Sequence, residues 1–440
     1  MDGLDPMTVT VIMFLSMLFF MLIGTPLAWA LLISGAGSAY FMWGPAGLDL
    51  LVNSAFSAMD NFLLVSLPLF IFMGLVLQRS GITDDLFSMI QKLLGGIPGG
   101  LGIGTVIICA LIAAMAGVSG AATVSLGIIA LPAMLKRGYD KKLVTGTIMA
   151  GGALGFLIPP SILMIVYAFL ARESVGKLFA AGMVPGLMLA VIYITYVLIR
   201  CRANPSLGPA IAAEDRGDLA EKLRSLKHLI MPGLLIVTVL GCIIMGITTP
   251  SEASAIGAGG ALLIAALHGR VNREMMTDVL LSTTRLMGML MWIALVAVFF
   301  SKVYTGLGAG MLVAEFIEDS TLTPTFVLLS MVVCFFVLGM FLDDFAIMFI
   351  TIPLFIPIVR ELGYDTTWFA VLFILSMQSA YLTPPFGFNL FYMRSVAPPS
   401  ITIMDIYKSA LPFVALQIGG LALVFMFPEI ALWLPNLLFG

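Results

Sequence analysis

Charged residues, histidine and cysteine are all scarce in this chain. Only 10% of its 440 residues are Asp, Glu, Lys or Arg, against about 25% in soluble proteins, and 61% are hydrophobic. This composition excludes a soluble enzyme and a disordered scaffold. A net charge of −3 gives no basis for binding nucleic acid. The four cysteines lie far apart, which argues against a disulfide framework or metal site. We therefore predict an all-α polytopic membrane protein within a lipid bilayer.

Eight apolar runs have the length of a membrane-spanning helix. They are Met7–Ile23, Leu27–Trp43, Phe62–Gln78, Leu178–Arg200, Leu229–Ile247, Ser251–His268, Leu286–Tyr304 and Leu411–Phe427. The first has an acidic flank and no basic residues before it, so we expect no cleaved signal peptide. Thr249 and Glu252 form a capping box, so we interpret this acid as a helix cap rather than a proton carrier.

Four shorter apolar stretches form two pairs, and each pair predicts a re-entrant helical hairpin. The first pair, Leu101–Ala116 and Val124–Leu135, is separated by a tip of small residues. The second, Phe326–Phe341 and Phe345–Val359, is separated by Leu342-Asp343-Asp344. Two further spans are broken by proline pairs, since proline cannot continue a helix. These are Leu143–Leu170, broken at Pro159-Pro160, and Trp368–Arg394, broken at Pro384-Pro385.

The distribution of basic residues predicts the orientation. With the Lys136–Lys142 loop in the cytoplasm, 17 of the 21 Lys and Arg fall on that side. The map has about ten transmembrane helices plus two hairpins, with both termini periplasmic. We expect amphipathic interfacial arms at Val271–Ser282 and Ile401–Ser409. The predicted divisions are scaffold helices 1–95, a first transport unit 96–177, scaffold helices 178–324 with a cytoplasmic linker 201–228 and an arm helix, a second transport unit 325–400, and a C-terminal arm and scaffold helix 401–440.

The two hairpin regions match at a constant offset of 225 residues. Pro132 matches Pro357, Gly138-Tyr139-Asp140 matches Gly363-Tyr364-Asp365, and the two proline pairs match each other. Three matches at one offset indicate an internal repeat. Because the hairpins begin on opposite sides, the repeats are inverted, which is typical of a secondary transporter with its site at the midplane.

Each proline pair removes two N–H donors, so we expect carbonyls without partners at Gly155 and Phe156, and at Ala380 and Tyr381. Converging carbonyl and hydroxyl oxygens suit Na⁺. Candidate donors are Ser119, Gly120, Gly155, Ile158 and Ser161 in the first half, and Asp343, Asp344, Ala380, Thr383, Phe386 and Asn389 in the second. Glycines such as Gly339 permit close approach of the backbone to an ion. The alternative is that the proline pairs are only kinks.

Asp343 and Asp344 are adjacent acids at membrane depth, where ionisable residues are usually functional. One would cap the returning hairpin arm and the other would place negative charge near a cation; which does which stays open. No Lys or Arg lies where it would neutralise a substrate carboxylate. An anionic substrate would depend on Na⁺, helix N-termini and polar side chains, for which the candidates are Ser119, Thr123, Ser161, Thr383 and Asn389.

At these residues the chain resembles the large membrane subunit of a tripartite ATP-independent periplasmic (TRAP) transporter. The motifs that carry the resemblance are Ser66–Gly74, Gly117–Gly120, Gly155–Ser161, Thr248–Ala253 and Leu382–Gly387. The resemblance implies an elevator-type transporter in the bacterial inner membrane. It implies a small four-helix membrane subunit, here on a separate polypeptide, and a periplasmic substrate-binding protein as partners.

The resemblance further implies Na⁺-driven uptake of an organic acid, such as a 2-oxo acid or dicarboxylate. It implies one Na⁺ site at the first hairpin with the break from Gly155 to Pro160. A second would lie at Gly339 with Ala380, Thr383 and Phe386. Two other classes remain as alternatives. Gly117-Val118-Ser119-Gly120 spells the motif of an intramembrane serine protease, which would need a histidine in reach. A passive channel is the other.

Overall fold

The computed structural model describes residues 6–117, 119–211, 219–308 and 322–440, and contains no strand in these ranges. The first half comprises α1 (Pro6–Leu22), α2 (Leu27–Trp43), α3 (Asp49–Met59), α4 (Phe62–Arg79), α5 (Ile82–Leu94), α6 (Gly100–Ala116), α7 (Ser119–Lys136), α8 (Lys141–Ala153), α9 (Ile162–Ala171) and α10 (Val175–Ala203). The expectation of an all-α protein is confirmed within the described residues.

The second half comprises α11 (Leu219–Ser225), α12 (Lys227–Ile244), α13 (Pro250–Leu267), α14 (Arg273–Gly306), α16 (Pro324–Gly339), α17 (Asp344–Glu361), α18 (Thr366–Ala380), α19 (Phe388–Val396), α20 (Ile403–Met426) and α21 (Glu429–Phe439). Short 3₁₀ turns lie at Gly44–Leu48, Leu154–Phe156 and Pro205–Leu207. Eight helical segments among the described residues are long and apolar enough to cross a membrane. The predicted hairpin arms are found as α6 with α7 and α16 with α17.

The 225-residue offset extends from residue identities to helix boundaries. The returning arms α7 and α17 begin at Ser119 and Asp344, which are 225 residues apart. Helices α8 and α18 begin at Lys141 and Thr366, at the same offset. The returning arm and the following broken helix therefore begin at equivalent positions in the two halves.

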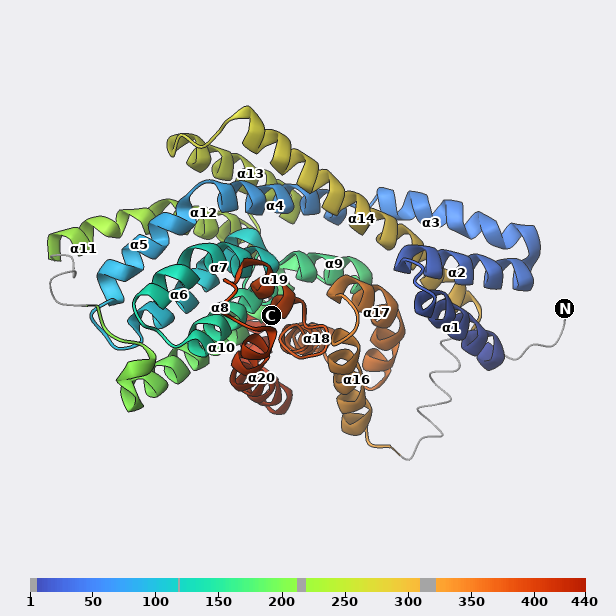
Figure 1. Ribbon diagram of the computed structural model, residues 1–440. Helices are drawn as coiled ribbons and strands as arrows, with labels where there is room; N and C mark the ends of the chain where they lie inside the picture. The colour runs from blue at the N-terminus through green and yellow to red at the C-terminus, as the bar shows by residue number, and fades with distance from the viewer. Residues whose placement is uncertain (1–5, 118, 212–218, 309–321) are drawn as a thin grey trace.

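The helices form two packed groups (Figure 1). In one, α4 packs along α13, and α14 packs against α2 and α3. In the other, α7 packs against α8 and α19, while α16 packs against α18. Helices α10 and α20, which the sequence division assigns to the scaffold, pack against each other and against α8 and α18. Helix α5 connects the two groups, since it follows α4 and packs on α6.

The two predicted arms are the first turns of longer helices rather than separate helices. Helix α14 runs unbroken from Arg273 to Gly306 because neither proline nor glycine occurs before Gly288 to stop it. Helix α20 starts at Ile403 behind a capping box of Thr402 and Asp405. The sequence pattern did not predict α5, a 13-residue amphipathic helix that buries Leu86 and Phe87.

Candidate functional site

The tip of the first hairpin docks onto the first helix break. Gly117 ends α6 with φ of 66°, in the left-handed region that favours glycine. A Cβ atom at Gly117 would lie 2.8 Å from the carbonyl oxygen of Pro160. The Gly117 carbonyl accepts a hydrogen bond from the N–H of Ile162, the first residue of α9, at 3.3 Å. The backbone of the tip therefore contacts the backbone of the break directly.

At the first break, a side chain replaces the donor that proline removes. The Ser161 hydroxyl donates to the Phe156 carbonyl at 2.8 Å, and its oxygen caps α9 by accepting from the Met164 N–H at 3.5 Å. Both Ser161 and Phe156 are buried. The prediction that the Phe156 carbonyl lacks a partner is therefore wrong, because a nearby hydroxyl can reach it.

At the second break, other groups also replace the donors that proline removes. The Thr383 N–H donates to the Ala380 carbonyl at 2.9 Å, and the Asn389 N–H donates to the Tyr381 carbonyl at 3.1 Å. The Thr383 hydroxyl donates to the Ser379 carbonyl at 2.8 Å. The prediction that the Ala380 and Tyr381 carbonyls lack partners is therefore also wrong. Each carbonyl oxygen has two lone pairs, so a single hydrogen bond leaves it able to bind a cation.

The second hairpin tip separates the roles of its two acids. Asp343 caps α17, since its carboxylate accepts from the Ala346 N–H at 2.9 Å. Asp344 is only 5% exposed and accepts from the Tyr381 hydroxyl at 2.6 Å. Neither carboxylate forms an ion pair with a lysine, arginine or histidine of the described ranges. Asp343 is therefore the cap, and Asp344 is the buried acid without a basic partner there.

One asparagine joins the two repeats. The Ser119 hydroxyl donates to Asn389 Oδ1 at 2.9 Å, and Asn389 Nδ2 donates to the Met149 carbonyl of α8 at 3.1 Å. Beside them, the Thr123 hydroxyl donates to the Ser119 carbonyl at 3.3 Å. Thr123 packs on α8, where a Cβ at Gly152 would lie 2.0 Å from its hydroxyl oxygen. A helix of the second half thus holds the hairpin tip of the first.

The remaining predicted residues lie at the same breaks and near the same tips. Gly155, Ile158 and Pro160 are buried at the first break. A Cβ at Gly120 would lie 2.8 Å from the Tyr392 ring, and one at Gly339 would lie 2.5 Å from Ala380 Cβ. Phe386 is half exposed, with its ring 6.3 Å from that of Phe341. The side chain of Tyr381 was missed because proline spacing points only to its carbonyl.

Four helix N-termini lie at the two tips and two breaks. Helices α7, α9, α17 and α19 begin there, at Ser119, Ile162, Asp344 and Phe388. Hydrogen bonds join the start of α7 to Asn389, the start of α9 to Gly117 and the start of α17 to Tyr381. At the start of α19, the Asn389 N–H donates to the Tyr381 carbonyl. Helix N-termini carry partial positive charge, so this arrangement can receive an anion.

The geometry does not support the protease alternative. Ser119 donates to Asn389, while His228 Nδ1 and His268 Nε2 each lie 3.3 Å from Asp85 Oδ2. Val118 of the motif lies outside the described residues. Those residues hold no group of three or more His, Cys, Asp or Glu suited to a metal ion. The oxygen-rich breaks and tips are therefore the candidate site.

The described residues are apolar and helical, and their two hairpins meet two broken helices, which is the fold of a membrane transporter. Residues 14–430 match the family model described as "Tripartite ATP-independent periplasmic transporter, DctM component", and the chain belongs to this family. It is a large TRAP permease subunit, and the resemblance drawn from the sequence motifs is confirmed. The family works with a periplasmic binding protein and a small membrane subunit.

Known relatives cover most of the chain. The C4-dicarboxylate TRAP transporter large permease protein DctM of Pseudomonas aeruginosa is 34% identical, over 92% of this chain and 93% of that protein. The isethionate TRAP transporter permease protein DctMQ of Oleidesulfovibrio alaskensis is 28% identical, over 98% of this chain and 67% of that protein. The YdaH transporter of Alcanivorax borkumensis shares the fold, with a TM-score of 0.68 at 14% identity over 96% of this chain and 99% of that one.

Proposed function

We propose that this subunit carries out Na⁺-coupled uptake of an organic acid handed over by a periplasmic binding protein. The observation that carries the proposal is the set of helix N-termini and spare oxygen lone pairs at the two breaks. Two relatives are named for C4-dicarboxylate and isethionate, both anions. A 2-oxo acid, dicarboxylate or related carboxylate fits the same partial positive charges.

Two Na⁺ sites follow from the donor atoms. The first would use Ser119, Gly120, Gly155, Ile158 and Pro160, and the second Gly339, Asp343, Asp344, Ala380, Thr383 and Phe386. The residues present fit a hard cation, because backbone carbonyls and hydroxyls dominate both sets. The Asp344 carboxylate, buried without a basic partner among the described residues, would gain charge balance from a bound cation.

The hydrogen bonds refine which groups would face the substrate. Each candidate side chain already donates a hydrogen bond within the protein; the candidates are Ser119, Thr123, Ser161, Thr383 and Asn389. Their oxygens can still accept, which suits Na⁺ better than a carboxylate. The partial positive charge of the helix N-termini is then the feature best suited to the anion.

The mechanism we propose is an elevator movement of the hairpins and broken helices against the scaffold. The close packing of α4 with α13 and of α7 with α8 supports a scaffold group and a hairpin group, which meet where α4 contacts α6 and α9 and where α14 contacts α17. The excess of Lys and Arg in one set of loops supports periplasmic termini in the bacterial inner membrane. The DctMQ relative, of which this chain covers 67%, supports a small four-helix membrane subunit as a partner.

Reconstitution tests this function. Proteoliposomes holding the large subunit, its small subunit and its binding protein should accumulate the organic acid only under an inward Na⁺ gradient. Vesicles with the large subunit alone should transport poorly. Equal uptake in both, or uptake unaffected by replacing Na⁺ with choline, would contradict the proposal. Saturable counterflow separates a transporter from a passive channel.

A further inference from the structure

Three hydrogen bonds, joined through the covalent structures of Tyr381 and Asn389, link the two hairpin tips. The link runs from Asp344 to the Tyr381 hydroxyl, along the Tyr381 backbone to its carbonyl, and on to the Asn389 N–H. The Asn389 side chain then accepts from Ser119 at the first tip. We call Asp344, Tyr381, Asn389 and Ser119 the tip bridge.

Repeat-related residues meet in this bridge. Phe156 and Tyr381 are 225 residues apart, and their rings pack edge to face with centroids 4.8 Å apart. Ser119 and Asp344 are separated by the same offset. Phe156 and Tyr381, at equivalent positions of the two repeats, thus lie against each other, but only Tyr381 has a hydroxyl, which donates to Asp344. The bridge therefore depends on Tyr381.

All four members of the bridge are buried. Ser119 is 2% exposed, Asn389 0%, Tyr381 6% and Asp344 5%. No member of the bridge can turn away without leaving a buried polar group unpaired, which is unfavourable. Glycine at position 387 keeps the Tyr381 carbonyl accessible, because a Cβ there would lie 2.7 Å from that oxygen. A rearrangement at one tip therefore changes the hydrogen bonds at the other tip.

We propose that Tyr381 and Asn389 are positioning residues that couple the two hairpin tips. The inference rests on the proposed function in one respect: each tip borders one of the two proposed Na⁺ sites. A cation that orders one tip therefore favours the ordered state of the other, and the effect is reciprocal. A purely structural Tyr381 would stabilise Asp344 without linking it to Ser119.

A double-mutant cycle with Na⁺ as the probe tests the coupling. Ser119→Ala and Asp344→Asn are combined in the complex of large and small subunits. The half-saturating Na⁺ concentration is read from thermal stabilisation against choline. With Tyr381 present, we expect the half-saturating Na⁺ concentration of the double variant to differ by about threefold or more from the value that the two single changes predict together. In the Tyr381→Phe background, the effect of the double change should equal the product of the two single effects.

Tyr167→Phe is the matched control. It also removes a buried tyrosine hydroxyl, one that donates to the Thr366 carbonyl at 3.2 Å and does not join the tips. This variant should retain the coupling between Ser119 and Asp344. Coupling that survives Tyr381→Phe, or that Tyr167→Phe also abolishes, overturns the proposal.

A second measurement needs no cation effect. In a background without the four native cysteines, Phe341→Cys places a thiol at the second tip, where Phe341 is 56% exposed. Ser119→Ala should raise its labelling rate by a thiosulfonate reagent, and should have no further effect in Tyr381→Phe. A labelling rate indifferent to Ser119→Ala overturns the bridge. If Na⁺ does not stabilise the wild-type complex, the proposed Na⁺ coupling fails, and labelling alone decides the bridge.

Discussion

Thr383 illustrates two uses of one side chain at the second break. Its hydroxyl donates to the Ser379 carbonyl, while its oxygen keeps lone pairs for a cation. Thr383→Val preserves the shape and removes that oxygen. If the oxygen binds Na⁺, the half-saturating Na⁺ concentration for uptake should rise, and substrate affinity should fall at low Na⁺ and recover at high Na⁺.

The measurement is initial uptake against Na⁺ concentration, normalised to folded protein. Thr383→Ser, which keeps the hydroxyl, is the control and should stay close to wild type. An unchanged half-saturating Na⁺ concentration in Thr383→Val would leave only the backbone carbonyl as a ligand.

Gly117 is the residue on which the first tip depends. Alanine at this position would need a left-handed conformation, and its Cβ would lie 2.8 Å from the Pro160 carbonyl oxygen. We expect Gly117→Ala to destabilise the protein by about 1 kcal/mol or more. Gly419 has open space around it within α20, so Gly419→Ala should be neutral or gain up to about 1 kcal/mol. Thermal unfolding of both variants checks the pair; similar losses would show that the tip conformation does not matter.

At the scale of elements, both histidines tie three helices together. Asp85 on α5 faces His228 on α12 and His268 at the end of α13. His268 Nδ1 lies 2.8 Å from the Ile264 carbonyl, which can only accept, while Nε2 faces the Asp85 carboxylate. The Asp85 carboxylate therefore contacts a ring nitrogen on each of two other helical segments.

Removing the Asp85 carboxylate should therefore weaken this three-helix contact. Asp85→Asn keeps the size of the side chain but takes the carboxylate away from both ring nitrogens, so we expect a lower melting temperature and a loss of about 1 kcal/mol or less of stability. Asp84→Asn, next to Asp85, is the control; an equal effect there would contradict a specific contact.

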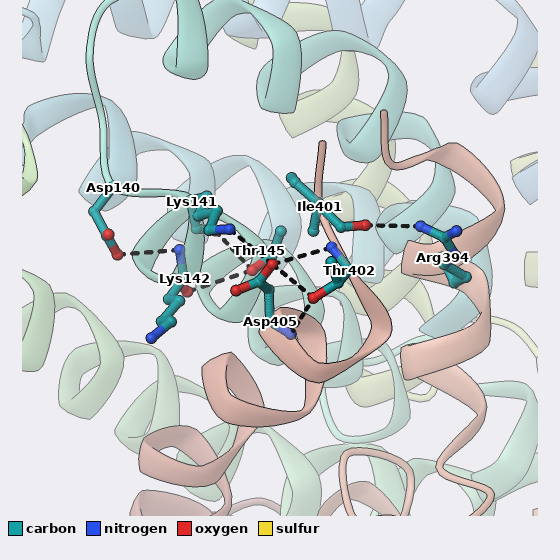
Figure 2. A network of polar contacts seen from close by, with 8 residues as sticks. All are labelled: Asp140, Lys141, Lys142, Thr145, Arg394, Ile401, Thr402 and Asp405. Atoms are coloured by element: carbon teal, nitrogen blue, oxygen red, sulfur yellow. Dashed lines mark hydrogen bonds and ion pairs between the residues drawn. The ribbon is translucent and has the colours of Figure 1, made fainter. Parts of the chain in front are cut away.

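A second contact between elements should be insensitive to pH near neutrality. Lys141 at the start of α8 lies 2.7 Å from Asp405 Oδ2, and Asp405 completes the capping box with Thr402 (Figure 2). Nearby, Arg394 of α19 donates to the Ile401 carbonyl at 2.7 Å. Asp405→Ala should lower the melting temperature by a similar amount at about pH 6 and 8, because hydrogen bonds from Lys141 and Thr402 hold the pKa of Asp405 well below its usual range. Asp405→Glu tests whether charge alone is sufficient.

At the scale of the whole molecule, inverted repeats require equivalent loops to lie on opposite sides of the membrane. A cysteine in the Lys136–Lys142 loop should be labelled only from the cytoplasm, and one near Arg360–Asp365 only from the periplasm. These loops are equivalent at the 225-residue offset. Labelling of both from one side would refute the inversion and with it the transporter mechanism.

The hydrophobic runs and proline pairs were sufficient to predict the helical membrane class, the hairpin arms and the two breaks. These features are local: a run of apolar residues or a proline pair has its effect within a few residues of chain. Helix α2, for example, begins and ends where its apolar run does. The repeat was also visible, because helix boundaries follow the same local signals in both halves.

The tertiary structure alone decided which groups meet at the site. The contacts of Tyr381 with Asp344 and of Ser119 with Asn389 join segments 37 and 270 residues apart in sequence. Packing between helices likewise decided which groups pair with the freed carbonyls and which acid caps α17. It also brought both histidines to Asp85. Proline spacing shows where donors are lost, but only the three-dimensional arrangement shows which side chain or N–H lies close enough to replace them.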